Sequence, residues 1–241
     1  MNIDRRKFIL TGLTASAAIT SARLLGEEPT KPAVVPEKAI RPEPKRGPRQ
    51  NLDDVFAFVR AGHDNLPRVK EMLAQNPKLV LAAWDWGDGD WETALGGASH
   101  IGSRDVARFL LSQGARIDAF CAAMLGEREV VAALVAANPS LATTKGPHGY
   151  TLLYHAAISG DLEIAKLLKP NLHPDANDFN QSLSAAVRDG HLPMTKWLFE
   201  NGTVDPNLPD ALGRRPLSLA LAKGFSSVVE ELRRHGAKET D

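Results

Sequence analysis

Apolar positions follow a fixed pattern from residue 52 to the end of the chain, and this pattern predicts pairs of short helices. It can be counted from five glycines: Gly102, Gly126, Gly160, Gly190 and Gly224. Alanine stands four residues before each glycine, and leucine stands eight residues after each one. Apolar residues at such spacings are typical of amphipathic helices, and a glycine can adopt the left-handed conformation that ends the first helix. Each unit is therefore expected to be a helix, a tight turn and a second helix.

The units have to stack, because neither helix of a pair can bury its apolar stripe alone. An earlier copy near Asn65 carries apolar residues at the corresponding positions, namely Phe58, Ala61, Val69 and Leu73. The pattern therefore predicts an all-α stack of about six units in residues 52–241.

Three segments also carry a recognisable consensus. Residues 93–102, 151–160 and 215–224 echo the pattern Thr-Pro-Leu-His-x-Ala-Ala-x-x-Gly, so this part of the chain resembles the ankyrin repeat. The resemblance implies an ankyrin-repeat solenoid of stacked helix-turn-helix units with short β-hairpin fingers. It also implies a concave face, formed by the fingers and by the two residues before each glycine, where partners bind.

One step of the pattern is short. The five glycines are separated by 24, 34, 30 and 34 residues, and the first step is about nine residues below the ankyrin period. The missing stretch corresponds to a finger, so we expect the third repeat, residues 118–140, to have none. Two outcomes stay open: the fingers of repeats two and four flank an open notch above Met124 and Leu125, or they collapse together and close it.

The N-terminal residues differ in composition from the repeats. Arg5 and Arg6 directly precede an apolar stretch that is too short to span a membrane comfortably, and residues 1–25 resemble a twin-arginine export signal. Residues 26–50 hold six prolines and ten charged residues, a composition that favours an extended tether. We therefore divide the chain into a signal segment (1–25), a linker (26–51) and a repeat domain (52–241). We expect an exported protein of the periplasm or cell envelope, with cleavage of the signal left open.

The finger expected for repeat two is rich in tryptophan and acid. Residues 83–92 read AWDWGDGDWE, and three tryptophans within eight residues are difficult to bury together. Exposed aromatic rings beside carboxylates make a recognition surface for a cationic peptide or a sugar. Packing of at least two of these rings onto neighbouring helices is the structural alternative. The spacing of the acids does not fit a calcium loop.

The finger and the groove positions together give the candidate site. The residues expected to bind a partner are Trp86, Asp88, Asp90, Trp91, Glu92, His100, Met124, His148, Tyr150, Ile158 and Arg188. Burial of the tryptophans would supply affinity, and the three carboxylates of the finger would favour a basic partner. The sequence thus predicts a monomeric binding module for a protein or peptide.

Composition and motifs argue against several other functions. Lysine plus arginine and aspartate plus glutamate number 29 each, and the finger is acidic, so a nucleic-acid partner is not expected. The single cysteine, Cys121, excludes an internal disulfide. The sequence has no phosphate-binding loop, zinc-protease motif or nucleophile elbow. We therefore expect no enzymatic activity, no cofactor and no bound metal.

Two alternatives to the binding module stay open. The first is a small-ligand or metal-assisted site in the notch, with or without catalysis, built from His100, His148 and the acids. Convergence of imidazole and carboxylate groups to metal-ligand distance would favour it. The second is a structural scaffold of the envelope, for which changes to the finger would have no effect.

Overall fold

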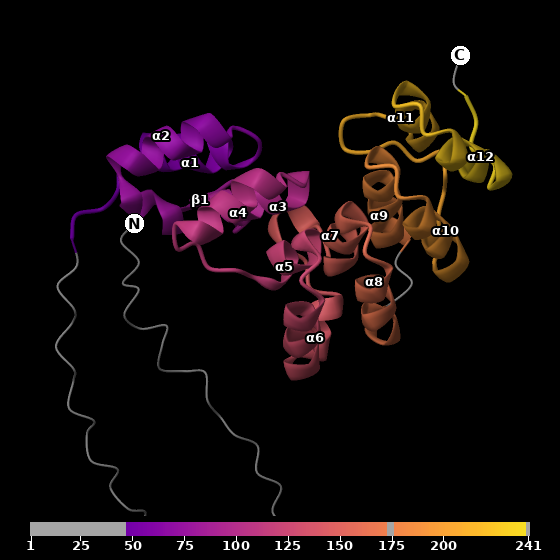
Figure 1. Cartoon of the computed structure of the whole chain (residues 1–241), viewed down its shortest axis with the longest axis horizontal. Coiled ribbons are helices and arrows are strands. Elements are labelled where there is room, and N and C mark those ends of the chain that lie inside the picture. Colours follow the sequence, from indigo (N-terminus) through magenta and orange to yellow (C-terminus); the bar gives the residue numbers. More distant parts are fainter. Residues whose placement is uncertain (1–46, 173–175, 240–241) are drawn as a thin grey trace, which may run out of the picture. The chain divides into compact units, whose positions relative to one another are not determined.

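The helices of the chain occur in pairs. A computed structural model describes residues 47–172 and 176–239, and twelve α-helices lie in these ranges. The pairs, labelled in Figure 1, are α1 (Leu52–Gly62) with α2 (Leu66–Gln75), α3 (Ala94–Ile101) with α4 (Arg104–Ser112), α5 (Ala119–Leu125) with α6 (Arg128–Ala137), α7 (Leu152–Ser159) with α8 (Leu162–Leu168), α9 (Ala176–Arg188) with α10 (Leu192–Asn201), and α11 (Pro216–Ala222) with α12 (Ser226–Arg234). The proposed signal segment and most of the linker lie outside the described residues.

Each pair packs against the next in the same way, so the helices form two layers. The first helices make the series α1, α3, α5, α7, α9 and α11, in which each contacts its successor. Among the second helices, α2 contacts α4, and α6, α8, α10 and α12 follow one another. The small residues of the sequence pattern lie between the layers and are fully buried: Ala98, Ala122, Ala156, Ala186 and Ala220. The predicted stack of helix pairs is confirmed.

The glycines of the pattern end the first helices. Gly102, Gly126 and Gly160 are the C-caps of α3, α5 and α7, and their φ angles of 88°, 80° and 71° are left-handed. This region is open to glycine without steric cost. The turns are therefore tight, and the second helix of each pair folds back onto the first.

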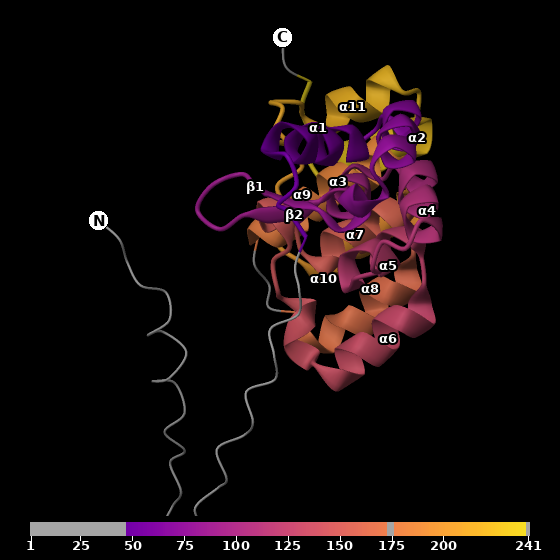
Figure 2. The same ribbon diagram turned by 90° about the vertical axis from the view of Figure 1, so that its left-hand side faces the viewer.

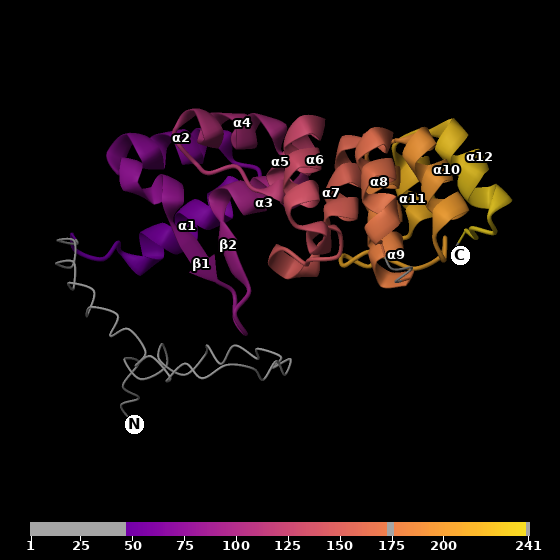
Figure 3. The same ribbon diagram turned by 90° about the horizontal axis from the view of Figure 1, so that it is seen from below.

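Fingers precede some of the pairs. In the first finger, β1 (Ala83–Asp85) pairs with β2 (Trp91–Thr93) in antiparallel fashion. Asp88 and Gly89 at its tip have φ angles of 51° and 82°, as the two central residues of a type I′ turn require. Figures 2 and 3 show this finger projecting beyond the helices.

The connections also contain four short 3₁₀ segments within residues 47–172 and 176–239. They are η2 (Pro77–Leu81), η3 (Pro139–Ala142), η4 (Pro147–Gly149) and η5 (Lys169–Asn171). Of these, η4 forms the tip of a second finger, whose base is a bridge between Lys145 and Thr151. None of the helices in the described ranges combines the length and the apolar character needed to cross a bilayer.

Repeat three departs from its neighbours. The six residues between α4 and α5 form no strand, as the short step in the sequence predicted. Its second helix, α6, buries Val131 and Val135, whereas Leu134, the leucine of the repeat pattern, is 36% exposed. A shift of one residue corresponds to a rotation of about 100° about the helix axis. In addition, α3 contacts α7 as well as α5, so repeats two and four meet across repeat three.

A histidine and glutamate cluster beside a cavity

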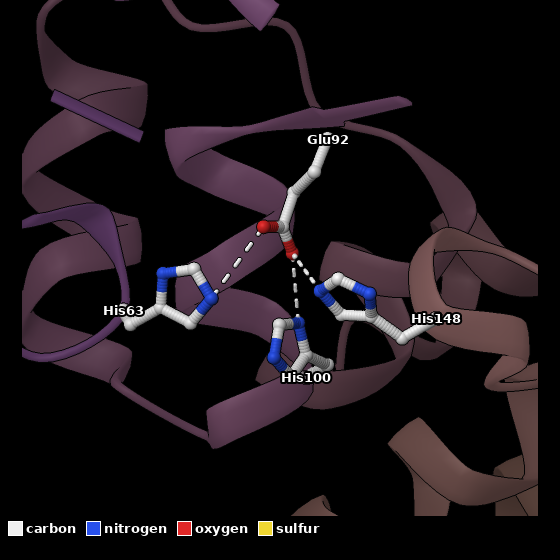
Figure 4. A group of neighbouring side chains, drawn as sticks. All are labelled: His63, Glu92, His100 and His148. Carbon is white, nitrogen blue, oxygen red and sulfur yellow. Dashed lines mark ion pairs between the residues drawn. The ribbon is translucent and has the colours of Figure 1, made fainter. Parts of the chain in front are cut away.

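A buried carboxylate lies among three imidazole rings where the first finger meets α3 (Figure 4). Glu92 stands on β2, and its side chain is 0% exposed. Its Oε1 lies 3.0 Å from Nδ1 of His100 and 3.5 Å from Nε2 of His148. Its Oε2 lies 3.4 Å from Nε2 of His63. One ligand atom from each of the four residues lies within 4.8 Å of all the others.

Four separate elements bring these side chains together. His63 is the C-cap of α1, Glu92 is on β2, and His100 is in the last turn of α3. His148 is at the tip of the second finger and has a φ angle of 57°. This left-handed conformation is uncommon for residues other than glycine and tends to occur at functional sites. The cluster therefore joins repeats one, two and four.

Outer contacts fix the orientation of His63 and Glu92. Nδ1 of His63 donates to the carbonyl of Val59 at 3.1 Å, and the hydroxyl of Ser103 donates to the carbonyl of His63. The indole N–H of Trp86 donates to Oε2 of Glu92 at 2.9 Å. With its Nδ1 proton engaged, neutral His63 presents the lone pair of Nε2 to the carboxylate.

The same arrangement holds for His148 and also joins the two fingers. Its backbone N–H donates to Oδ1 of Asp90 at 3.0 Å, and its Nδ1 donates to Oδ2 of Asp90 at 2.7 Å. Nε2 of His148 is left to face Glu92. Because Asp90 belongs to the first finger, the fingers of repeats two and four are in direct contact, and the notch between them is closed.

Two consecutive glycines in α3 leave room for the cluster. A Cβ atom on Gly97 would lie 2.8 Å from Nδ1 of His63, and one on Gly96 would lie 3.3 Å from Cγ of Glu92. Glycine within a helix costs about 1 kcal/mol relative to alanine. The close approach of His63 and Glu92 to α3 explains why the helix contains both.

Burial disfavours the charged forms of both Glu92 and His63. It would raise the pKa of Glu92, but the close approach and charge of the His100 imidazole, followed by His63 and Trp86, lower this pKa below its ordinary value. Burial lowers the pKa of His63 below its ordinary value, although the charge of Glu92 acts in the opposite direction. Glu92 is therefore a carboxylate at neutral pH, while burial favours the neutral form of His63.

A cavity of about 420 Å³ begins at the cluster, since both His100 and His148 line it. Tyr150 and Tyr154 stack at 4.0 Å between ring centroids, and the Tyr154 hydroxyl donates to the carbonyl of His100 at 3.0 Å. Burial raises the pKa of Tyr154 to about 12. Arg188 on α9 and the loop of residues 208–214 complete the walls.

Comparison with known families decides what the repeated unit is. A family model described as "Ankyrin repeats (many copies)" matches residues 183–232, and one described as "Ankyrin repeat" matches residues 148–178. This part of the chain consists of ankyrin repeats. Together with the stacked helix pairs, these matches establish an all-α ankyrin-repeat solenoid, a fold that points to a module for protein–protein interaction. No curated protein matches the chain.

The ankyrin fold brings several of the predicted site residues together. Glu92, His100 and His148 meet in the cluster, and His100, His148, Tyr150 and Arg188 line the cavity. Trp91 and Asp88 are exposed on the first finger, and Trp91 retains 61% of its surface. His100, His148, Tyr150 and Arg188 thus surround one hollow, whereas Trp86, Asp88 and Trp91 do not line it.

Two predicted groove residues are not on the surface. Met124 is 0% exposed and Ile158 is 3% exposed, so their placement on the floor of the concave face was wrong. The reason is that α5 packs between α3 and α7, and α7 packs between α5 and α9. The cavity accordingly lies beside α9 and not above repeat three.

The predicted acidic surface of the finger is also corrected. Glu92 is buried and Asp90 is bonded to His148, so only Asp88 among the three acids keeps the exposed position assumed for it. Two of the three tryptophans pack on α1, because Trp84 and Trp86 lie 5.2 Å and 5.8 Å from Phe56, measured between ring centroids. The structural alternative for these two rings is therefore confirmed.

The sequence prediction missed His63. It lies two residues before Asn65, and His100 lies two residues before Gly102, so the repeat register itself gives the two histidines equivalent positions. Tyr154 and the loop of residues 208–214 were missed as well, because nothing in the repeat pattern distinguishes them.

His155 and Cys121, which belong to residue types that often carry chemistry, are buried in the core. His155 is 1% exposed, and its Nδ1 donates to the carbonyl of Thr151 at 2.8 Å. Cys121 is fully buried, and burial raises the pKa of its thiol to about 11. Neither residue is exposed to a ligand, so neither carries the chemistry of a site.

Proposed function

We propose that the chain is an exported ankyrin-repeat module that binds a protein or peptide partner in the cavity beside the cluster. The observation that carries this proposal is a hollow built from aromatic rings and an arginine on the face formed by first helices and fingers. Tyrosine and arginine are enriched where binding energy concentrates in protein interfaces. The cavity volume of about 420 Å³ suits one or two anchoring side chains.

Exposed apolar residues around the cavity support this proposal. Ile101, Leu208 and Leu212 all line it and are all exposed, and Leu212 retains 74% of its surface. Arg188 and Arg214 are each paired with an aspartate, Asp189 and Asp210. We therefore propose apolar anchoring as the main source of affinity. The preference for a basic partner loses its main support, because Asp90 and Glu92 are engaged with histidines.

Export is the part of the proposal that rests on sequence alone. Arg5, Arg6 and the apolar stretch after them resemble a twin-arginine signal, and residues 1–46 lie outside the described part of the chain. The periplasm or cell envelope is the compartment in which the partner would then be sought.

The test compares two exposed leucines. The full chain is immobilised and exposed to an envelope fraction, and the retained proteins are compared with those retained by Leu212→Asp and Leu134→Asp. Leu134 is an exposed leucine on α6 that does not line the cavity. A partner retained by the wild type and by Leu134→Asp, but reduced at least about tenfold by Leu212→Asp, supports the proposal. Equal retention by both variants would contradict a partner site in this cavity.

A second candidate function follows from the position of the cluster. His100 and His148 belong to the cluster and also line the cavity, which favours a metal-assisted site for a small ligand. This candidate requires that a ligand in the cavity change the environment of the bound metal. It would be contradicted if small ligands of the cavity left the spectrum of a bound Co²⁺ ion unchanged.

A further inference from the structure

The cluster contains lone pairs that face one another. The Nδ1 atoms of His63 and His148 are held by the Val59 carbonyl and by Asp90. Their Nε2 atoms then point at the two oxygens of Glu92, at 3.4 Å and 3.5 Å. In this orientation the Nε2 lone pair of a neutral imidazole faces the negatively charged oxygen of the carboxylate, and the two repel each other. A cation between them would turn this repulsion into four favourable contacts.

Two atoms of the cluster are buried without a hydrogen bond. Oε1 of Glu92 and Nδ1 of His100 are both enclosed, and within the described part of the chain neither makes one, although they lie 3.0 Å apart. Buried polar atoms are nearly always satisfied in native proteins, and exceptions call for an explanation such as an ion. Both of these atoms are of the kind that coordinates metals.

The distances fit a tetrahedral metal site. Zinc binds imidazole nitrogen and carboxylate oxygen at about 2.0–2.2 Å, which places neighbouring ligand atoms of a tetrahedron about 3.3–3.6 Å apart. From Oε1 of Glu92, the distances to Nδ1 of His100 and Nε2 of His148 are 3.0 Å and 3.5 Å, close to this edge length. Nε2 of His63 faces the second oxygen, Oε2, at 3.4 Å, and one ligand atom from each of the four residues lies within 4.8 Å of the others. We propose that His63, Glu92, His100 and His148 form a binding site for one Zn²⁺ ion. A set of three nitrogens and one oxygen favours zinc and related first-row metals over magnesium and calcium.

The surroundings of the cluster are those of a metal centre. Histidine ligands usually donate their second N–H to a carbonyl or a carboxylate, which fixes the ring and raises its basicity. Val59 serves His63 in this way, Asp90 serves His148, and Trp86 donates to the carboxylate ligand. His63 and His148 are 21% and 31% exposed, so an ion can enter from solvent. The site goes beyond the proposed partner binding and does not depend on it.

The ion would cross-link three repeats. Its ligands come from the end of α1, from the first finger and α3, and from the second finger, so they belong to repeats one, two and four. The contact between Asp90 and His148 already joins the two fingers. A four-coordinate ion with protein ligands only is typical of structural zinc sites.

Zinc affinity of the full chain, made without a histidine tag and freed of metal with a chelator, tests the site directly. Zn²⁺ is titrated in competition with a chromogenic chelator, and one equivalent is expected to bind. His148→Ala removes a ligand from an exposed finger tip and is expected to weaken Zn²⁺ binding by more than about 100-fold. Loss of a hydrogen bond that orients a ligand already lowers metal affinity about 10- to 100-fold, and loss of the ligand itself should cost more. His235→Ala is the matched control, since His235 stacks on Phe199 away from the cluster. It is expected to bind Zn²⁺ as the wild type does.

Several results would overturn the proposal. They are the absence of a bound equivalent, equal affinity of His148→Ala and wild type, or equal binding of Mg²⁺ and Zn²⁺. If circular dichroism shows that His148→Ala is unfolded, Asp90→Asn replaces it and is expected to weaken binding about 10- to 100-fold, and an unchanged affinity would reject the site. Co²⁺ in place of Zn²⁺ should give the intense visible absorption of a tetrahedral complex, whereas the weak absorption of an octahedral complex would contradict the geometry.

Discussion

At the scale of single residues, four histidines of the described part of the chain occupy two contrasting environments. His155 is enclosed in the core and donates to a backbone carbonyl, whereas His63, His100 and His148 face a buried carboxylate. Burial lowers the pKa of His155 to about 4, well below its ordinary value of 6.5. His155 is therefore a residue whose neutrality the fold requires, and this requirement can be measured.

Stability should fall as the pH is lowered from 6.5 towards 4. In this window the unfolded chain binds a proton at His155 that the folded chain does not, so acid favours unfolding. The contribution is complete above pH 6.5, and about 3 kcal/mol of it is lost by pH 4. Urea unfolding of the metal-free wild type and of His155→Gln between pH 7 and pH 4 tests this. The variant should show a shallower dependence, by up to one proton, and parallel curves would contradict the prediction.

A second residue-scale prediction concerns the glycines of α3. Gly97→Ala should improve helix propensity but should weaken Zn²⁺ binding by more than about tenfold, the scale of disturbed outer contacts, since its Cβ would lie 2.8 Å from His63 Nδ1. Gly96→Ala, whose Cβ would lie 3.3 Å from Cγ of Glu92, should have a smaller effect. Competition titration of both variants gives the answer. Wild-type affinity in Gly97→Ala would mean that His63 is not held against α3.

At the scale of elements, the first finger is a two-sided strand pair. Trp84 and Trp86 pack on Phe56 of α1, and Glu92 turns inward to the cluster. Trp91 stands out into solvent. The finger is thus attached to repeat one by its aromatic side, and one exposed ring is left available for a partner.

Replacement of the two tryptophans should separate these roles. Trp86→Ala should lower the free energy of unfolding by about 2–3 kcal/mol, somewhat less than for a fully buried ring, because it removes packing and a hydrogen bond to Glu92. Trp91→Ala should change it by less than about 0.5 kcal/mol. Chemical denaturation of the pair is the measurement. An equal loss in both variants would show that Trp91 is structural as well.

Much of the element scale could be predicted from the sequence, and the limits of that prediction have physical causes. The alanine and glycine spacing predicted helix pairs and the missing finger of repeat three, because burial and turn geometry repeat with the unit. It could not predict that His148 donates hydrogen bonds to Asp90, since that contact depends on the φ angle of 57° of His148 at the finger tip. Met124 was misplaced because the packing of α5 between two helices is a property of the stack and not of the repeat.

At the scale of the whole domain, the cluster connects repeats that are not neighbours along the chain. Hydrogen exchange with and without Zn²⁺ should reveal this connection. Added Zn²⁺ should slow exchange in residues 83–93 and 145–151 together, while α10 and α12 should not respond, because they lie outside the cluster. Protection confined to one of the two fingers would contradict a shared ion.

Repeat arrays normally behave as one-dimensional chains, in which stability is the sum of each unit and its contact with the next. The short third repeat changes this rule, because it allows α3 to reach α7 and Asp90 to reach His148. We therefore expect coupling between second neighbours to make repeats one to four unfold as one cooperative block, while the helices of repeats five and six pack mainly on those of adjacent repeats. The array should therefore begin to unfold at its C-terminal end. The absence of a finger in repeat three would then give the domain a cooperative N-terminal part and a less stable C-terminal part.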